Sequence, residues 1–598
     1  MLKVVGASLE QTRLTQFLLL AVILIAIFAI FFYEASPPTM DGRYAATASW
    51  HEKTGYKLTF WGQNNDPANI KLSAARAYYT PLDKSTGWAS MEIQTNEQYD
   101  DVVQATAAGM LEGSLSWQLI YFHWQNTVGT TCKKRANFCQ AVKTILENNY
   151  NQVKQSAQRY KNENSFWYQV NLIYAQLEGL HEGWKTGKER SLGKMIHELT
   201  FTDFLWMNHV DDVRDIEMML DITSNRTTST NLLKPPTDLA VLKYLPTSDS
   251  QFLIAHQRSG SYTEMLRLMK RYTFGYHDMP GKTSNLVPGQ QISFTSYPGA
   301  VLSQDDFYQI KGMSRLQIVS SRIRVHNPKT WGHLHDLTVF SGARAMVANR
   351  LSMNAGVWAS FFSKYNSGTG NKAWLVMDHR APDPNLWLVE QVPAFTNKTD
   401  ITESWKQQGY WISCGIPDSE KALRLSGLTD STSGKRDMEY MTSIKQILEN
   451  GIFDVTNTDS MHALVASPSL VTKVRGDIVG NGNAATNFAN PSSTTPSSST
   501  DKVGIFRKQP LQGKFLEKTQ KVVAATQDSE TPAFNGVIDT KLAFDTSDFK
   551  AVAGPLYTLN EATIAPFQWS KASPPKGTFH IGQPDVWDFE PVHPKFVW

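Results

Sequence analysis

The stretch DLAVLKYLPTSDSQFLIAH, residues 238–256, decides the fold. Within it, LAVLKYL (Leu239–Leu245) is a short apolar run typical of a buried strand, and QFLIAH (Gln251–His256) is a second such run. The intervening PTSDS consists of turn residues, so the pair predicts a β-hairpin. Helical patterns before this hairpin and further strands after it predict a mixed α+β fold.

On the N-terminal side of the hairpin the pattern is helical from about residue 100 to 222. LEGSLSWQLIYFHWQNT, for example, places Leu111, Leu115 and Leu119 close to helical spacing. Residues 34–95 are polar and rich in turn residues, apart from short strand-like pieces such as Tyr56–Trp61. We therefore expect a largely helical N-terminal part.

After the hairpin, Ser261-Tyr-Thr-Glu264 has the pattern of a capping box, which predicts a helix with Met265, Leu268, Met269 and Tyr272 on one face. A second helix is predicted over residues 343–362. Strand signals recur, with hairpins rather than regular βαβ alternation, at residues 291–295, 306–310, 314–320, 373–377, 386–389 and 410–414.

The composition excludes several classes of protein. The 598 residues include 58 Lys+Arg and 55 Asp+Glu, a net charge of +3, so charge gives no drive toward nucleic acid and we expect no nucleic-acid partner. With 41% hydrophobic and 19% charged residues, global disorder is excluded. Three cysteines exclude a disulfide-dense scaffold and a four-cysteine metal site. No G-x-S-x-G nucleophile elbow occurs.

A charge-free apolar run, FLLLAVILIAIFAIFFY, occupies residues 17–33. A helix of about 17–25 residues spans a bilayer core, so the run favours an uncleaved signal anchor, with a signal peptide as the alternative. Lys3 and Arg13 precede the run, which places a short tail, residues 1–16, in the cytosol. The body is then expected in a secretory or lysosome-like lumen or outside the cell, held to the membrane by this helix.

Two further patterns agree with a lumenal body. Asn225-Arg-Thr and Asn397-Lys-Thr are acceptor sequences for N-glycosylation. Cys132 and Cys139 bound a short loop that could hold a disulfide in an oxidising compartment, which leaves Cys414 as a buried thiol.

Metal and cofactor signals are weak. His333 and His335 alternate on a possible strand near His326, but no carboxylate or cysteine cluster completes a ligand set. GYHDMPGKT (Gly275–Thr283) differs from a phosphate-binding loop in the spacing of its glycines. We expect neither a metal site nor a cofactor.

A series of motifs in a fixed order resembles the phospholipase B-like family, the group that includes the lamina ancestor proteins. They are Gly109–Gly113, His123–Thr127, Gln176–Leu180, Ser296–Gly299, Asp305–Tyr308, Lys364–Thr369 with Asn371 and Trp374, Glu390–Pro393, Gly409–Trp411, Leu425–Gly427, Phe534–Gly536, Asp539–Lys541 and Gly582–Val586. The resemblance covers residues 100–430 and about 530–595; the stretch after Leu428 diverges.

This resemblance implies a four-layer α/β/β/α sandwich of the N-terminal nucleophile hydrolase superfamily. In that family the precursor cuts itself before a cysteine, which then supplies a thiolate nucleophile and a free α-amine as base. The implied reaction is hydrolysis of an acyl ester or amide bond in a lipid. The implied ligand is therefore a lipid or an acyl amide.

The same resemblance divides the chain into segments. Beyond the tail and the anchor, these are residues 34–226 (N-terminal part of the body), 227–238 (loop at the self-cleavage position), 239–480 (hydrolase core), 481–502 (low-complexity linker) and 503–598 (C-terminal part of the core).

The sequence departs from the family at the nucleophile. Anchoring the strand on Ala240, Lys243 and Pro246 places Asp238 where the family has cysteine. A carboxylate is a poor acyl acceptor, and without cleavage no new α-amine forms, so both halves of the mechanism fail. Thr237 is the alternative nucleophile, but a shift of one residue along a strand turns the side chain to the opposite face.

Three further residues match positions around the family's site. His256 ends the second hairpin strand, and Asn366 and Asn371 lie in the segment that faces the nucleophile in the family, where an amide can stabilise an oxyanion. The alternative for His256 is a hydrogen-bonded core histidine, and for the two asparagines it is turn formation.

The sequence thus favours an inactive relative that is not self-cleaved. The alternatives are an active lipid hydrolase that uses Thr237 and a lumenal, membrane-anchored binding or scaffold protein.

Overall fold

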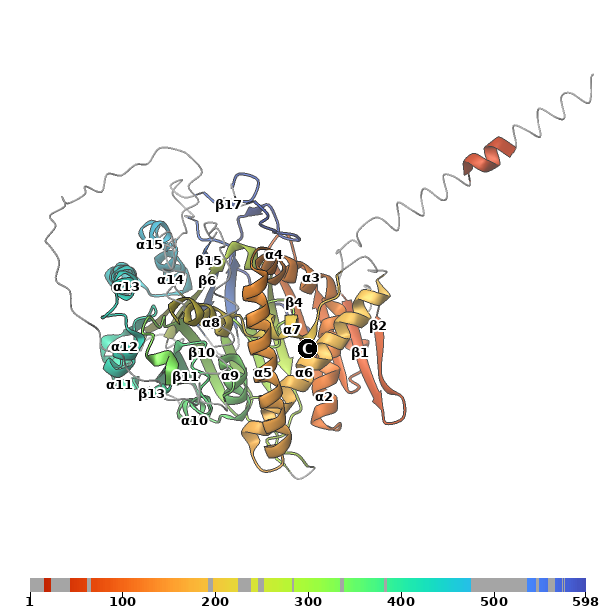
Figure 1. Cartoon of the computed structure of the whole chain (residues 1–598), viewed down its shortest axis with the longest axis horizontal. Coiled ribbons are helices and arrows are strands. Elements are labelled where there is room, and N and C mark those ends of the chain that lie inside the picture. Colours follow the sequence, from red (N-terminus) through yellow and green to blue (C-terminus); the bar gives the residue numbers. More distant parts are fainter. Residues whose placement is uncertain are drawn as a thin grey trace, which may run out of the picture. The chain divides into compact units, whose positions relative to one another are not determined.

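The computed structural model describes residues 16–22, 44–61, 66–191, 197–223, 238–245, 252–281, 284–333, 338–380, 384–474, 535–544, 548–557, 565–572, 574 and 576–598 (Figure 1). The chain divides into two compact units, Met1–Gly42 and Arg43–Trp598. In the first unit residues 16–22 are helical, and most of the predicted anchor lies outside the described residues. In the part of the chain that is described, no helix is both long and apolar enough to cross a membrane.

The second unit contains a sheet of eleven strands in the order β13-β12-β11-β10-β9-β8-β7-β4-β3-β1-β2. Neighbouring strands are antiparallel except for the parallel pair β4 and β7. The strands are β1 (Tyr44–His51), β2 (Gly55–Trp61), β3 (Ala75–Thr80), β4 (Trp88–Thr95), β7 (Arg267–Thr273), β8 (Gln291–Ser296), β9 (Tyr308–Lys311), β10 (Arg315–Arg322), β11 (Lys372–Asp378), β12 (Asn385–Val392) and β13 (Phe395–Asp400).

A second, antiparallel sheet has the order β14-β5-β6-β15-β16. Its strands are β5 (Leu239–Tyr244), β6 (Phe252–Ser261), β14 (Tyr410–Ser413), β15 (Asn535–Ala543) and β16 (Phe549–Ala553). The predicted hairpin is confirmed, because β5 and β6 pair with Ala240 opposite His256. A small ribbon joins β17 (Phe567–Gln568) to β18 (Val586–Trp587).

The predicted helical region is also confirmed. Its helices are α2 (Asp101–Leu115), α3 (Trp117–Trp124), the π-helix η2 (Gln125–Gly129), α4 (Thr130–Lys134), α5 (Ala136–Tyr160), α6 (Ser165–Arg190), α7 (Phe201–Asn208) and α8 (Val210–Thr223). The later helices are α9 (Ser341–Leu351), α10 (Ala355–Phe362), α11 (Thr402–Gln408), α12 (Glu420–Ser426), α13 (Thr432–Gly451), α14 (Thr458–Val465) and α15 (Pro468–Val474). Short 3₁₀ turns are η1 (Pro67–Asn69), η3 (Tyr262–Glu264), η4 (Thr330–His333) and η5 (Ile452–Asp454).

Helices cover one face of the large sheet. Helix α2 packs on β1, β3 and β4, and α10 packs on β11 and β12. Helix α6 lies close against α2 because both helices carry glycines at their contact. A Cβ on Gly109 of α2 would lie 1.9 Å from the Gln176 carbonyl oxygen, and one on Gly183 of α6 would lie 2.1 Å from that of Met110. Any larger residue at these two positions would push the helices apart.

The small sheet lies between helices and the large sheet. Alternate residues of β5 and β6, such as Leu239, Val241 and Leu253, join an apolar cluster with α13, α14 and α15. Because side chains alternate across a strand, Asp238, His256 and Arg258 face the other way. That other face meets the large sheet, where β5 contacts β10 and the His256 ring lies 3.0 Å from the Ser320 carbonyl oxygen.

One predicted helix is wrong. Ser261 caps only the single turn η3, its hydroxyl accepting from the Thr263 N–H at 3.3 Å, and the chain then enters strand β7. Strand β7 pairs with β4, about 180 residues earlier in the chain, and with β8. These pairings outweigh the local helical signal, because tertiary context overrides propensity.

Two other expectations need correction. The N-terminal region that reads as turn-rich forms the four strands β1 to β4. The helix predicted over residues 343–362 is two helices, α9 and α10, separated at residues 352–354. Asn354 begins the second helix, since its side-chain oxygen accepts from the Val357 N–H at 2.8 Å.

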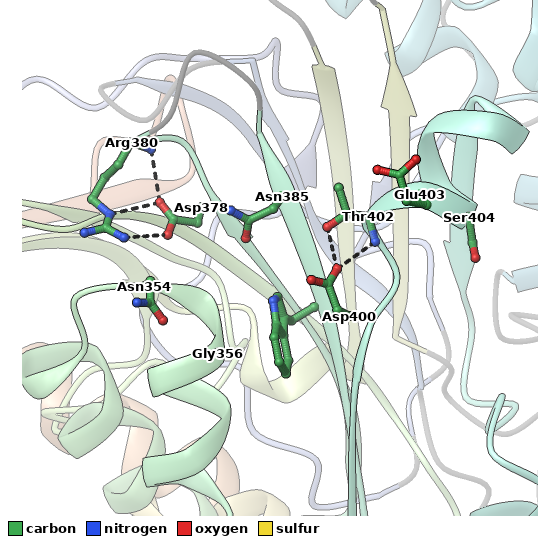
Figure 2. Close-up of a pocket in the computed structure, with 10 residues that line it drawn as sticks. Asn354, Gly356, Asp378, Arg380, Asn385, Asp400, Thr402, Glu403 and Ser404 are labelled. Carbon is green, nitrogen blue, oxygen red and sulfur yellow. Dashed lines mark hydrogen bonds and ion pairs between the residues drawn. The ribbon is translucent and has the colours of Figure 1, made fainter.

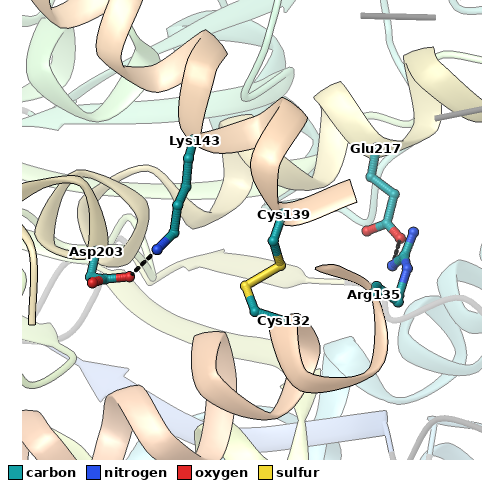
Figure 3. Close-up of a disulfide and its surroundings, with 6 residues drawn as sticks. All are labelled: Cys132, Arg135, Cys139, Lys143, Asp203 and Glu217. Carbon is teal, nitrogen blue, oxygen red and sulfur yellow. Dashed lines mark hydrogen bonds and ion pairs between the residues drawn. A yellow bond between two sulfur atoms is a disulfide. The ribbon is translucent and has the colours of Figure 1, made fainter. Parts of the chain in front are cut away.

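The predicted disulfide between Cys132 and Cys139 is present, with 5.5 Å between the Cα atoms (Figure 3). It joins α4 to the start of α5. Two ion pairs hold this region to neighbouring helices: Arg135, between α4 and α5, pairs with Glu217 of α8, and Lys143 of α5 pairs with Asp203 of α7. Cys414 is a buried free thiol, as expected.

Candidate functional site

Asp238 lies immediately before β5 and is buried, with 4% of its surface exposed. Its Oδ1 accepts from the backbone N–H of Ser259 at 2.8 Å, and its Oδ2 accepts from Nη1 of Arg258 at 2.9 Å. The carboxylate therefore forms a charge-assisted contact to the neighbouring strand β6 through both of its oxygens.

Arg258 connects Asp238 to helix α8. Its guanidinium donates to Asp211 at 2.6 Å (Nη2 to Oδ1) and 3.2 Å (Nη1 to Oδ2). Burial would lower the pKa of Arg258, but Asp211 and Asp238 outweigh it and raise that pKa well above its usual value. Burial likewise opposes ionisation of Asp211, and Arg258 and Lys372 outweigh it, so the pKa of Asp211 lies well below its usual value.

The network continues into the large sheet. Lys372, at the start of β11, has its Nζ 2.6 Å from Oδ2 of Asp211 and also pairs with Asp306. Asp306 accepts a further hydrogen bond from the Ser320 hydroxyl at 2.8 Å and has a left-handed backbone, φ 59°. Burial raises the pKa of Asp306 to about 7. The buried charges therefore form a chain, Asp238–Arg258–Asp211–Lys372–Asp306, which we call the inter-sheet network.

His256 lies on the same face of β6 as Arg258 but bonds elsewhere. Its Nε2 is 3.0 Å from the Ser320 carbonyl oxygen, and no described residue offers a hydrogen bond to Nδ1. A carbonyl only accepts, so Nε2 carries the proton. Burial holds the pKa of His256 well below its usual value, which keeps the ring neutral.

The two predicted asparagines have structural partners. Asn371 donates to Oδ2 of Asp215 from its backbone and its side chain, each at 2.9 Å, and its side chain also donates to the Gly368 carbonyl at 2.9 Å. Asn366 shapes a turn, because its Oδ1 accepts from the Gly368 N–H at 2.8 Å and its amide donates to the Val392 carbonyl at 3.1 Å. Asn371 thus joins α8 near the network, and Asn366 does not. Thr237 and Asn225 lie outside the described residues.

The acids of α8 were not predicted from the sequence. Asp211, Asp212 and Asp215 are buried, although charged helix residues usually face solvent. Arg322 pairs with Asp215 at 2.7 Å, and the Thr369 hydroxyl donates to Asp212 at 2.7 Å. The family motifs in the sequence did point to this part of the fold. They include Asp305, Asp306 and Asn371, which lie among or next to the buried charges around α8.

A second buried cluster lies between the sheets. Arg267 of β7 pairs with Asp305 and with Asp539 of β15, and Lys541 pairs with Asp539. This cluster connects β15 to the large sheet. Each buried charge in it has an opposite charge as a partner, which offsets the cost of removing the ions from water.

His209, between α7 and α8, is 2% exposed, and no described residue offers a hydrogen bond to either ring nitrogen. Burial lowers its pKa from 6.5 to about 3. The imidazole binds a proton less readily in the folded state than in the unfolded state, where its pKa is 6.5. The folded state is therefore favoured fully above pH 6.5, and this contribution to stability is lost as the pH falls from 6.5 toward 3. We expect the stability advantage of the wild type over His209→Gln to shrink by about 3 kcal/mol between pH 7.5 and 4.5, since the loss is about 1.4 kcal/mol per pH unit below 6.5.

Urea unfolding at both pH values measures this difference. The matched control is His51→Gln, which replaces an exposed histidine and leaves His209 in place. A constant difference between the wild type and His209→Gln would contradict the neutral buried imidazole.

A cavity of about 480 Å³ lies apart from the network, at the β11–β13 edge of the large sheet (Figure 2). Its lining is polar, and several lining groups bond to one another: Arg380 pairs with Asp378 at 3.2 Å, and Asp400 accepts from the Thr402 hydroxyl at 2.6 Å. None of the residues predicted for the site lines it. In the described ranges, no group of three or more His, Cys, Asp and Glu side chains could hold a metal ion.

The sequence is similar to one protein family and to several of its members. The profile of the family described as Phospholipase B matches residues 75–594. The chain is 30% identical to the phospholipase B-like lamina ancestor of Drosophila melanogaster over the full length of both. It is 31% identical to phospholipase B-like 2 of Homo sapiens, over 88% of this chain and 86% of the human protein. It is 28% identical to phospholipase B-like protein C of Dictyostelium discoideum, over 62% and 66%. The chain therefore belongs to the phospholipase B family.

Proposed function

We propose that this chain is a phospholipase B family member that is neither self-cleaved nor active at the family's nucleophile position, which Asp238 occupies. The two stacked sheets between helical layers support an N-terminal nucleophile hydrolase sandwich. The observation that carries the proposal is the contact of Asp238 with Arg258 at 2.9 Å and with the Ser259 N–H at 2.8 Å.

The chemistry follows from those contacts. Self-cleavage begins when a thiol or hydroxyl attacks the carbonyl of the preceding residue, and its proton must move to a base. The Asp238 carboxylate has no such proton, and its two oxygens already accept hydrogen bonds. An uncut chain also lacks the α-amine that would serve as base in the mature enzyme.

The neighbouring groups support the same conclusion. Burial holds the pKa of His256 well below its usual value, which makes its imidazole a weak base, and the Asn371 amide donates to Asp215 and Gly368. A catalytic base has to take up a proton, and an oxyanion donor has to offer an N–H to the substrate. Here these side chains stabilise the fold between the sheets.

A hydrolysis assay tests the proposal. Purified full-length protein is incubated with phosphatidylcholine vesicles or with an N-acylethanolamine. Its rate of fatty-acid release should be no higher than that of the variant Asp238→Asn. Hydrolysis that Thr237→Ala abolishes, while the variant stays folded, would show that a threonine substitutes for the missing cysteine and would contradict the proposal.

For the compartment, we propose a lumenal body anchored by residues 17–33. The disulfide between Cys132 and Cys139 supports an oxidising environment. The acceptor Asn397 supports it as well, because it lies on the edge strand β13 and is partly exposed. Its side-chain amide donates to the Thr399 hydroxyl at 3.0 Å, which brings together the two residues that the acceptor sequence requires.

A glycan on Asn397 is therefore expected in protein from a secretory host. Asn397→Gln and Thr399→Ala should each migrate faster on a denaturing gel by one glycan, and treatment with peptide N-glycosidase should remove the difference. Thr399→Ser is the matched control, because serine also completes the acceptor sequence and should keep the glycan. If Asn397→Gln migrates with the parent before deglycosylation, no glycan is attached there.

A further inference from the structure

A serine, a histidine and an aspartate form a hydrogen-bonded series away from Asp238. The Ser433 hydroxyl lies 3.1 Å from Nδ1 of His326, and Nε2 of His326 lies 3.0 Å from Oδ2 of Asp437. Ser433 and Asp437 lie one turn apart on α13, and His326 follows strand β10. Nucleophile, base and orienting acid within hydrogen-bond reach are the geometric signature of covalent acyl transfer, whatever the order in the chain.

The acid and the base are held in place by burial. Asp437 is 7% exposed. Burial would raise its pKa, but the hydrogen bond from His326 and the charge of Arg324, 3.3 Å away, outweigh it and lower that pKa, so the group is ionised at neutral pH. An ionised carboxylate only accepts, so Nε2 of His326 carries the proton. Nδ1 is then left to accept the proton of the Ser433 hydroxyl.

The backbone around Ser433 favours negative charge. Ser433 is exposed and lies in the first turn of α13, where Ser431 caps the helix by accepting from the Gly434 N–H at 2.9 Å. The N–H groups of Thr432 and Ser433 have no carbonyl one turn earlier within the helix. Such amides, with the positive end of the helix dipole, can stabilise an oxyanion next to the hydroxyl.

We propose that Ser433, His326 and Asp437 form a second, independent site that hydrolyses short-chain carboxylic esters. The Ser433 oxygen bonds to the ester carbonyl carbon while its proton moves to Nδ1 of His326. The carbon–oxygen bond to the alcohol then breaks, and the imidazolium returns the proton to the leaving alcohol. Water, deprotonated by the same imidazole, then attacks the carbonyl carbon of the acyl-serine. The bond to the Ser433 oxygen breaks, the imidazolium returns the proton to that oxygen, and the acid leaves. The exposed position of Ser433 admits a small ester directly from solvent.

A fluorophosphonate probe tests this site in the folded, full-length protein. Phosphonylation, located by peptide mass spectrometry, is expected at Ser433 and absent in Ser433→Ala. Ser443→Ala is the matched control on the same helix, since the Ser443 hydroxyl donates to the Tyr440 carbonyl and no histidine in the described ranges bonds to it. No adduct at Ser433 at any probe concentration that labels a serine esterase would overturn the proposal.

The base is tested by rate. His326→Gln keeps a side-chain amide that can reach Asp437 and should slow labelling of Ser433 by roughly 100-fold or more. Equal labelling rates would mean that Ser433 is an ordinary surface hydroxyl, which overturns the proposal. If His326→Gln fails to fold, labelling of the wild-type protein tests the site instead. Wild-type labelling that is roughly 100-fold faster at Ser433 than at Ser443 supports the site, and equal rates at the two serines overturn it.

Discussion

Self-cleavage is expected to appear when Asp238 is replaced by cysteine. In Asp238→Cys the thiol takes the place of a carboxylate that lies 2.9 Å from the Arg258 guanidinium. A neighbouring cation lowers the pKa of a thiol and so raises the thiolate fraction. The variant should run as two fragments on a denaturing gel, divided just before residue 238, while the parent runs whole.

Asp238→Asn is the control for this experiment, because it keeps the shape of the side chain and supplies no thiol. It should stay whole. If Asp238→Cys also stays whole while it is folded, then the surrounding groups have lost the arrangement that self-cleavage needs, and the nucleophile is not the only missing part.

Removing Arg258 is expected to have the largest effect on stability. Arg258→Met leaves the Asp238 carboxylate buried without its cation and leaves Asp211 with Lys372 and Arg214. Breaking a buried ion pair from one side costs about 3–5 kcal/mol, since an uncompensated charge remains in the interior. Urea unfolding monitored by tryptophan fluorescence should show a loss of that size.

Two further variants sharpen the measurement. Lys445→Met removes a cation from an exposed pair with Glu449 on α13, where we expect a loss of about 0.5 kcal/mol or less. Combining Arg258→Met with Asp238→Asn should recover part of the loss, because the amide is neutral. A loss for Arg258→Met as small as that for Lys445→Met would show that the inter-sheet network contributes little to the fold.

Much of the fold follows from sequence periodicity. The apolar runs of β5 and β6 predict their hairpin, and the alternation of side chains places Asp238 and His256 on one side of it. The strand β7 is not predictable in this way, because its pairing with β4 depends on residues far away in the chain. A local capping pattern therefore misleads at Ser261.

The candidate site was only partly predictable for a related reason. Resemblance to the family singles out Asp238 and Asn371 as candidates, but it does not show which charges pair with them. Charged residues such as Arg258 and Asp211 usually face solvent. Both are buried here because each meets an opposite charge between the sheets. Partners from distant segments, such as Lys372 for Asp211, appear only when the two sheets are stacked.

The most direct test of the central claim is to determine the N-termini of the purified protein. Sequencing of the N-termini, together with the intact mass after deglycosylation, should find no polypeptide that begins at residue 238, because the Asp238 carboxylate is bound by Arg258 and has no proton for the first step. A polypeptide that begins at Asp238, in amounts matching its N-terminal partner fragment, would contradict the account.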